Sequence, residues 1–305
     1  MCPHERAPSY IMTAVRRLIF VMSVLLAARV IGQTVPTDRF VSTVNNYRLH
    51  ILDWGGPQSG KPTLILLHGI ARHAHTFDHI APELAKKYRV LAIDMRGHGD
   101  SSWSPDGDYD VEDYVFDLEK VVERLGLNGV SLLGNSTGGR VAQVFAGLNP
   151  DKVAKLVVED VGPERPQSIA NAFARRVEQE KDGWANENDL VAQLVAQNPK
   201  TPEALLRTYA HFGVKKREDG RLIWKRDPNL VKGFVETDLW DRVRRITAPT
   251  LYVLGGASRI VPPETQQKLK DTLPNVRVVV MPGLGHYPDE EDTAGFMKIV
   301  EGFLQ

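Results

Sequence analysis

The decisive stretch of this chain is Val130-Ser131-Leu132-Leu133-Gly134-Asn135-Ser136-Thr137-Gly138, which continues into the helical pattern of residues 139–146. An apolar strand, a Gly-x-Ser-x-Gly turn and a helix form the pattern of a nucleophile elbow. In such an elbow the serine occupies a strained turn, and small residues on either side let the backbone pass closely. We therefore predict that Ser136 is a nucleophile. The structural alternative is a plain strand-to-helix turn in which Ser136 caps the helix.

The rest of the chain alternates between apolar strands and amphipathic helices of ordinary length. This alternation predicts an α/β fold with a mostly parallel central sheet and helices on both faces. A hairpin over residues 40–54 is expected before the parallel part. The expected strands cover residues 63–67, 88–94, 130–133, 155–160, 250–255 and 276–281, and the expected helices include 74–87, 110–126 and 290–304.

The pattern changes after Gly162, where strand signals give way to polar helical segments. We predict helices over residues 169–181, 186–196 and 202–212, with no strong strand between Pro163 and about Val243. The domain prediction is therefore a core formed by residues 33–162 and 244–305, with residues 163–243 inserted as a helical cap that covers the pocket.

The N-terminus has the composition of a secretory signal. Arg16-Arg17 precede the apolar run 18–28, and small residues follow, so residues 1–32 are predicted to be a signal peptide. The protein is then expected to be secreted or periplasmic, without stable membrane insertion after cleavage; an uncleaved anchor helix is the alternative. The only cysteine, Cys2, precedes the signal, so no disulfide, catalytic thiol or cysteine metal site is expected in the mature chain.

The charge balance of the chain gives information about the kind of partner to expect. The 305 residues contain 38 Lys and Arg against 38 Asp and Glu, which gives a formal net charge of +0. Such a balance gives no indication of a nucleic-acid partner, and a small-molecule substrate is expected instead.

An activated serine needs a base and two oxyanion donors. His286 follows the last expected strand, so it should lie at the same sheet edge as Ser136, where the carboxyl ends of parallel strands meet. The backbone N–H of Thr137 is one expected oxyanion donor. The other is the N–H of Ile70, in the loop after the strand 63–67.

The chain resembles the α/β-hydrolase superfamily over about residues 35–305. The resemblance rests on four motifs in the expected order, each after a strand: His68-Gly69, residues 94–101 (Asp-Met-Arg-Gly-His-Gly-Asp-Ser), residues 134–139, and Gly285-His286. It implies an α/β-hydrolase fold and no cofactor. The surroundings of Asn135 and Gly139 look like the branch of small esterases, enol-lactonases and meta-cleavage C–C hydrolases.

The chain departs from the family at the triad acid. The pattern expects an aspartate at about Ser258 or Arg259, and neither is acidic. A carboxylate at the end of the strand after the elbow could reach the same histidine, as it does in some haloalkane dehalogenases of this fold. We expect Asp160 to be this acid, with Glu159 as the alternative. Both carboxylates could instead form salt bridges to Arg140, Arg165 or the cap.

The sequence thus predicts a serine hydrolase that cleaves a small carboxylic ester or lactone through an acyl-enzyme, with the triad Ser136, His286 and Asp160. Gly69, Arg72 and His73 are the expected substrate-binding residues, and no histidine spacing marks a metal site. Two alternatives stay open. One is a meta-cleavage C–C hydrolase with the same triad. The other is a non-catalytic binding protein that has lost its acid.

Overall fold

The computed structural model describes residues 35–43, 47–55 and 60–305. The predicted signal peptide, residues 1–32, lies outside the described residues, and export stays a prediction. Among the helices of the described part, none combines the length and the apolar character that crossing a bilayer requires.

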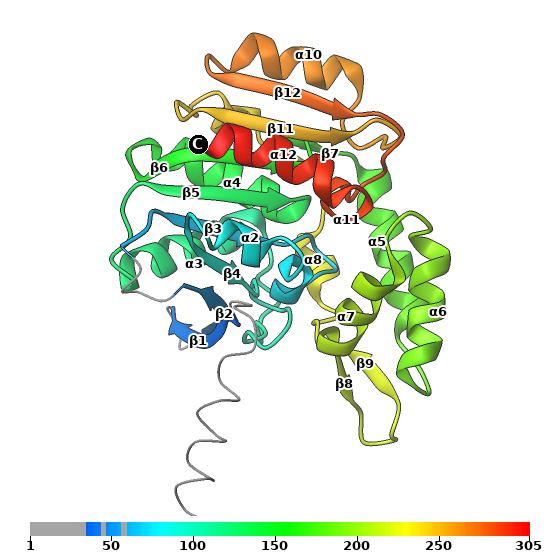
Figure 1. Cartoon of the computed structure of the whole chain (residues 1–305). Helices are drawn as coiled ribbons and strands as arrows, with labels where there is room; N and C mark the ends of the chain where they lie inside the picture. Colours follow the sequence, from blue (N-terminus) through cyan, green and yellow to red (C-terminus); the bar gives the residue numbers. More distant parts are fainter. Residues whose placement is uncertain (1–34, 44–46, 56–59) are drawn as a thin grey trace, which may run out of the picture. The chain divides into compact units, whose positions relative to one another are not determined.

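The described part is built on one eight-stranded sheet with the order β1-β2-β4-β3-β5-β6-β11-β12 (Figure 1). The hairpin strands β1 and β2 pair antiparallel, β2 pairs antiparallel with β4, and all other pairs are parallel. The predicted α/β class and mostly parallel sheet are therefore confirmed. The strands are β1 (Thr37–Ser42), β2 (Arg48–Trp54), β3 (Thr63–Leu67), β4 (Arg89–Ile93), β5 (Val130–Asn135), β6 (Val153–Glu159), β11 (Thr250–Gly255) and β12 (Val276–Met281).

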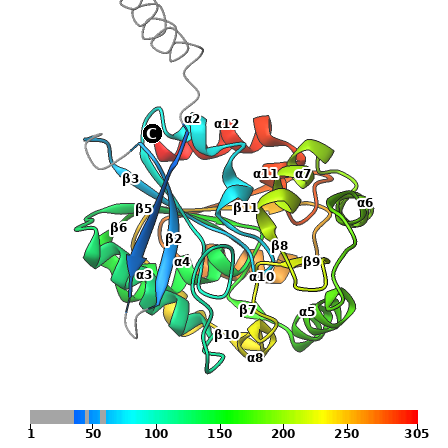
Figure 2. The same cartoon turned by 90° about the horizontal axis from the view of Figure 1, so that it is seen from below.

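Successive residues of the central strands point to opposite faces, and each face packs against its own helices. On β6, Leu156 and Val158 join the core formed with α3 (Val111–Arg124), α4 (Thr137–Leu148), α9 (Trp240–Val243) and α10 (Pro263–Thr272). Val157 joins the opposite core, formed with α2 (Ala81–Leu84) and α12 (Thr293–Leu304). Figure 2 shows these two helical layers on either side of the sheet.

Two expected helices are broken in the structure. The helix expected over residues 74–87 is replaced by a 3₁₀ turn, η3 (Ala74–Phe77), and the short α2. The second residue of α2 is Pro82. Proline has no N–H to continue a preceding helix and restricts the residue before it. The last helix is divided into α11 (Pro288–Glu291) and α12, because Asp292 leaves the helical conformation and caps α12 through Gly295 N–H at 3.0 Å.

The segment between β6 and β11 contains the inserted helices. They are α5 (Gln167–Glu180), α6 (Glu187–Gln197), α7 (Glu203–Gly213) and α8 (Leu230–Gly233). Besides these helices, two short antiparallel ribbons form, which the expectation of no strong strand did not include. One joins β7 (Glu164–Arg165) to β10 (Thr237–Asp238), and the other joins β8 (Val214–Lys216) to β9 (Leu222–Trp224). Strands of two or three residues carry too little hydrophobic pattern to be seen in the sequence.

Candidate active site

Ser136 stands at the turn between β5 and α4 with φ 51° and ψ −118°. A non-glycine residue in this region is strained by about 1–3 kcal/mol, and such strain persists only where the surroundings enforce it. Here a Cβ at Gly134 would lie 2.4 Å from Gly138 O, and a Cβ at Gly138 would lie 2.1 Å from Leu67 O. Both glycines are therefore required for the close passage of the backbone that presents Ser136.

His286 and Asp160 meet at this edge of the sheet. His286 Nδ1 lies 2.7 Å from Asp160 Oδ2, and the Asp160 carboxylate also accepts hydrogen bonds from Gly255 N–H at 2.9 Å and Ser258 Oγ at 2.6 Å. Asp160 is 1% exposed and has φ 42°, so the chain turns sharply as it leaves β6. Three donors around this buried carboxylate hold it in one orientation.

Glu159, the alternative acid, faces the other side of the sheet. Its Oε1 accepts the N–H of Asp289 at 2.9 Å, and its side chain is fully buried. Burial raises the pKa of Glu159 well above its ordinary value, and the neighbouring Asp289 carboxylate raises it further. The structure therefore brings Asp160, and not Glu159, to His286. Strand alternation is the cause, because adjacent residues of β6 point to opposite faces.

The backbone N–H groups expected in the oxyanion hole are both available. Neither Ile70 N–H nor Thr137 N–H donates a hydrogen bond to any acceptor among the described residues. Gly69 lets the loop approach the elbow, because a Cβ there would lie 2.8 Å from Asn135 Oδ1 and 3.3 Å from Ser136 Cβ. The loop and the elbow are thus in close contact, as two donors that share one oxyanion require.

His68 holds this loop in place and does not face the cavity. Its Nδ1 donates to Gly69 O at 2.8 Å and its Nε2 accepts Met95 N–H at 3.0 Å, a pairing that requires the neutral ring. Burial lowers the pKa of His68 to about 3, in agreement with a neutral ring.

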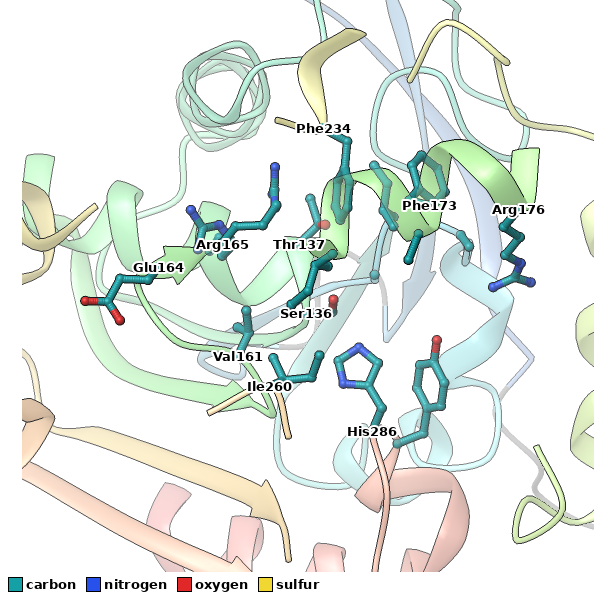
Figure 3. A pocket seen from close by; sticks show the side chains of 17 residues that line it. Ser136, Thr137, Val161, Glu164, Arg165, Phe173, Arg176, Phe234, Ile260 and His286 are labelled. Carbon is teal, nitrogen blue, oxygen red and sulfur yellow. The ribbon is translucent and has the colours of Figure 1, made fainter. Parts of the chain in front are cut away.

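A cavity of about 260 Å³ connects these groups (Figure 3). Apolar side chains from α5, the loop after β11 and the segment after α8 form much of its wall. Three arginines also contribute to it. The lining residues are Gly69, Ile70, Ala71, Ser136, Thr137, Arg140, Val161, Glu164, Arg165, Ile169, Ala172, Phe173, Arg176, Phe234, Ile260, His286 and Tyr287.

The expectation that Arg72 and His73 bind substrate is corrected by their surroundings. Neither lines the cavity. Arg72 is buried, pairs with Glu290 at 3.0 Å, and has its guanidinium carbon 4.5 Å and 4.0 Å from the ring centroids of Tyr209 and Tyr287. His73 Nε2 contacts Tyr209 O at 3.0 Å, and burial lowers the pKa of His73 to about 4. Both side chains join the core to α7.

The expectation for Arg140 and Arg165 as partners of Glu159 or Asp160 is also corrected. Arg140 donates to the carbonyl oxygens of Gly162 and Pro163, and Arg165 donates to Val235 O. Both arginines also line the cavity, which was not expected from the sequence. A signal was present, because Arg140 follows Ser136 by about one helical turn on the elbow helix.

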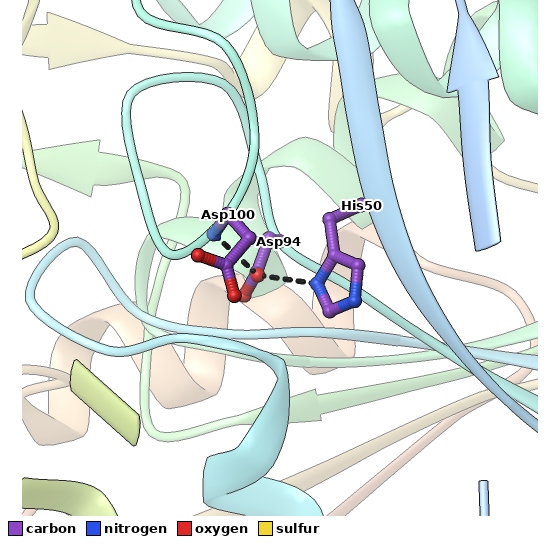
Figure 4. Close-up of side chains that lie close together, drawn as sticks. All are labelled: His50, Asp94 and Asp100. Atoms are coloured by element: carbon purple, nitrogen blue, oxygen red, sulfur yellow. Dashed lines mark hydrogen bonds and ion pairs between the residues drawn. The ribbon is translucent and has the colours of Figure 1, made fainter. Parts of the chain in front are cut away.

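Three side chains that could bind a metal ion lie close together beside the loop that follows β4 (Figure 4). They are His50, Asp94 and Asp100, and one potential ligand atom from each lies within 4.8 Å of the others. The Asp94 carboxylate already accepts three hydrogen bonds from within the protein. The donors are His50 Nδ1 at 2.7 Å, Ala74 N–H at 2.6 Å and Asp100 N–H at 3.0 Å. The Asp100 carboxylate pairs with Lys225 Nζ at 2.8 Å. These contacts make Asp94 a brace for the loop that follows β4.

Comparison with known proteins agrees with this geometry. The family model described as alpha/beta hydrolase fold matches residues 62–293. Three relatives are 2-(acetamidomethylene)succinate hydrolase of Mesorhizobium japonicum (26% identical, covering 88% of this chain and 97% of the relative), an esterase of Mycobacterium tuberculosis (29%, 87% and 89%) and 2-hydroxy-6-oxononadienedioate/2-hydroxy-6-oxononatrienedioate hydrolase of Cupriavidus pinatubonensis (28%, 88% and 95%). A crystal structure of E-2-(acetamidomethylene)succinate hydrolase superposes with a TM-score of 0.80 at 26% identity, over 88% of this chain and 99% of that one.

Proposed function

This chain belongs to the α/β-hydrolase fold family, and on that premise we propose that it is a serine hydrolase that cleaves a small carboxylic ester, lactone or amide. The arrangement that carries the proposal is the 2.7 Å contact between His286 Nδ1 and Asp160 Oδ2, in a cavity lined by both His286 and Ser136. A nucleophile, a base and an orienting carboxylate are the parts that acyl transfer needs.

In the proposed reaction, Ser136 Oγ attacks the substrate carbonyl while His286 Nε2 takes the hydroxyl proton. The carbonyl π electrons move onto oxygen, and the N–H groups of Ile70 and Thr137 bind the resulting oxyanion. When the tetrahedral intermediate collapses, the bond to the leaving alcohol or amine breaks and His286 returns the proton to it. Water then attacks the acyl-enzyme by the same steps, which releases the acid and restores Ser136.

Asp160 has an orienting role in this mechanism. Its carboxylate accepts the Nδ1–H of His286, which leaves Nε2 free to act as a base toward Ser136. It also stabilises the imidazolium that forms during each attack, because an opposite charge at this distance favours the charged ring. This contact argues against the binding-protein alternative, whose motivation was the missing carboxylate at Ser258 and Arg259.

The test is covalent labelling followed by substrate turnover. We expect a fluorophosphonate probe to modify the wild-type chain at Ser136 and to leave Ser136→Ala unmodified. A panel of small phenyl esters, lactones and anilides, with compounds that carry carboxylates included, should then show turnover by the wild type alone. A folded wild-type protein that neither reacts with the probe nor hydrolyses any member of the panel would disprove the proposed function.

The meta-cleavage C–C hydrolase shares the triad and is separated by the same panel. Turnover of a vinylogous 1,5-diketone without turnover of any ester or amide would favour that alternative. The relative from Cupriavidus pinatubonensis is named for a substrate of this type, and this is the reason to include one in the panel.

A further inference from the structure

Two of the arginines that line the cavity are buried without a counter-ion. Arg140 is 1% exposed and Arg165 is 7% exposed. Among the described residues, no carboxylate oxygen lies within 4.0 Å of either guanidinium group. Buried cations are normally paired, because removing a charge from water is expensive unless an opposite charge compensates.

The contacts that these arginines do make are with neutral groups. Arg140 Nη1 donates to Gly162 O at 3.0 Å and Pro163 O at 2.8 Å, its Nη2 donates to Thr237 Oγ1, and its Nε is buried without any hydrogen-bond partner. Arg165 Nη1 donates to Val235 O at 3.1 Å, and its guanidinium carbon lies 3.9 Å from the centroid of the Phe234 ring. Both side chains therefore keep N–H groups that no acceptor in the described part of the chain uses.

The carboxylate that comes nearest in sequence, Glu164, is occupied elsewhere. It accepts hydrogen bonds from Trp240 Nε1 and Thr265 Oγ1 and lies 3.4 Å from Lys268 Nζ. Figure 3 shows its carboxylate directed away from the labelled pocket residues. Glu164 thus does not neutralise Arg140 or Arg165 by direct contact.

The third arginine of the cavity gives a contrast. Arg176 has a direct carboxylate partner, Glu180 at 3.0 Å, which it shares with the buried Arg226. It lies at the other side of the pocket from Arg165 in Figure 3, with Ser136 and His286 between. Among the three arginines of the cavity, Arg140 and Arg165 are therefore the two without a carboxylate in direct contact among the described residues.

The pKa values of the two arginines are consistent with the lack of a carboxylate in direct contact. Burial lowers the pKa of Arg140 to about 9, and repulsion by Arg165 contributes to the shift. Burial also lowers the pKa of Arg165 to about 10. Both side chains remain cations at neutral pH, and each would be stabilised by an anion placed between them.

We propose that Arg140 and Arg165 bind a carboxylate of the substrate, so that the preferred ester or amide carries a negative charge away from its scissile bond. This inference rests on the proposed function and adds the substrate class to it. A carboxylate suits the site, because its two oxygens match the planar fork of a guanidinium group and its charge compensates the pair. A neutral substrate of the same shape would leave both charges buried and unpaired.

The test compares two esters with the same leaving group, 4-nitrophenyl hemisuccinate, whose acyl chain ends in a carboxylate, and 4-nitrophenyl butyrate, whose acyl chain ends in a methyl group. We expect kcat/KM to be about 10- to 100-fold higher for the hemisuccinate, the range that a hydrogen-bonded ion pair supports. Glutarate should inhibit the hydrolysis of 4-nitrophenyl butyrate competitively, and the uncharged glutaramide should not. This inhibition does not depend on where the carboxylate lies in the natural substrate. A wild-type enzyme that hydrolyses butyrate but shows neither effect would overturn the inference and leave the proposed function intact.

Variants assign the effect to the arginine pair. Arg165→Met should abolish most of the preference between the two esters and weaken glutarate inhibition, whereas Arg165→Lys should keep much of both because it keeps the charge. Arg176→Met is the matched control, since Arg176 already has a direct carboxylate partner in Glu180, and it should retain the preference. Loss of the preference in Arg176→Met but not in Arg165→Met would overturn the assignment. If Arg165→Met does not fold, the inference is decided by the ester preferences of Arg165→Lys and Arg176→Met and by the inhibition of the wild type by glutarate. Failure of the proposed function is distinct, because no ester would then be hydrolysed and Ser136 would not be labelled.

Discussion

Ser258 donates a hydrogen bond of 2.6 Å to Oδ2 of Asp160, the same oxygen that lies 2.7 Å from His286 Nδ1. The residue that stands where the family usually has its triad acid therefore contacts the acid that replaces it. The two positions work on one carboxylate, because β6 and β11 are adjacent parallel strands whose carboxyl ends meet. In the proposed triad, the carboxylate is therefore supplied one strand away from its usual position.

Removing the Ser258 hydroxyl should weaken catalysis without abolishing it. We expect Ser258→Ala to lower kcat by about 10-fold, because a hydrogen bond to a charged group contributes about 1.5–3 kcal/mol and Gly255 N–H still holds the other carboxylate oxygen. Steady-state kinetics would measure the change, and Ser258→Thr, which keeps the hydroxyl, should recover most of it. An unchanged kcat in Ser258→Ala would show that this bond does not support the triad.

The two adjacent carboxylates of the β6 end should respond very differently to substitution by amides. Asp160→Asn should lower kcat by roughly 10³- to 10⁴-fold, because an amide cannot stabilise the imidazolium or select the tautomer of His286. Glu159→Gln should keep kcat within about 3-fold, since a change of one hydrogen-bond partner far from the reacting atoms is a modest perturbation. The assignment fails if the larger loss occurs in Glu159→Gln.

Glu159 should also make the stability of the protein depend on pH. Its pKa is raised in the folded state, so the folded chain keeps a proton that the unfolded chain loses near pH 4.5. The contribution of this group to stability is fully present below pH 4.5 and is lost as the pH rises toward the folded-state pKa. Glu159→Gln removes this loss, because the amide imitates the protonated acid.

Urea denaturation at pH 5 and pH 8 would measure the effect. The free energy of unfolding of Glu159→Gln relative to wild type should increase with pH, by up to about 1.4 kcal/mol for each unit in which only the unfolded chain is ionised. Glu123, whose side chain is exposed, offers a control, and Glu123→Gln should show no such rise. A constant difference between Glu159→Gln and wild type would contradict a retained proton.

Gly69 should be intolerant of even one methyl group. In Gly69→Ala the new Cβ would lie 2.8 Å from Asn135 Oδ1, so the loop or the elbow must shift. A displaced Ile70 N–H would reduce oxyanion stabilisation, and we expect kcat to fall by about 10²- to 10³-fold, as when one donor is removed. Kinetics together with a melting curve separate this loss from unfolding. Full activity in Gly69→Ala would exclude Ile70 as a donor.

The Arg72 contact should contribute strongly to stability. Arg72→Met leaves Glu290 buried without its cationic partner, and we expect the free energy of unfolding to decrease by about 3–5 kcal/mol. The exposed pair of Arg244 and Asp241 provides the control, since Arg244→Met should change stability by about 1 kcal/mol or less. Urea denaturation of both variants tests the difference, and equal effects would contradict a buried ion pair.

Much of the fold was predictable, because the central strands are continuous apolar runs and a parallel sheet follows from their alternation with helices. The elbow was predictable for the same reason, since Gly134, Ser136 and Gly138 encode a turn that few other residues allow. The positions of Arg72 and His73 were not, because their neighbours on α7 and α11 are more than a hundred residues away in the chain. The buried charges of Arg140 and Arg165 could not be seen either, because a charged residue gives no sign in the sequence that it lacks a partner.

The relocated carboxylate has a consequence for how this protein could change over evolutionary time. In the usual arrangement, the loop after β11 both supplies the acid and borders the pocket, so mutations that alter selectivity put the chemistry at risk. Here the proposed acid, Asp160, directly follows β6, while Ile260 of the loop after β11 lines the cavity. Ser258 contacts Asp160 and Val261 packs in the core, whereas Ala257, Arg259 and Ile260 are thus free to vary under selection for new substrates. A directed-evolution library confined to these positions should yield altered specificity at a low frequency of inactive clones.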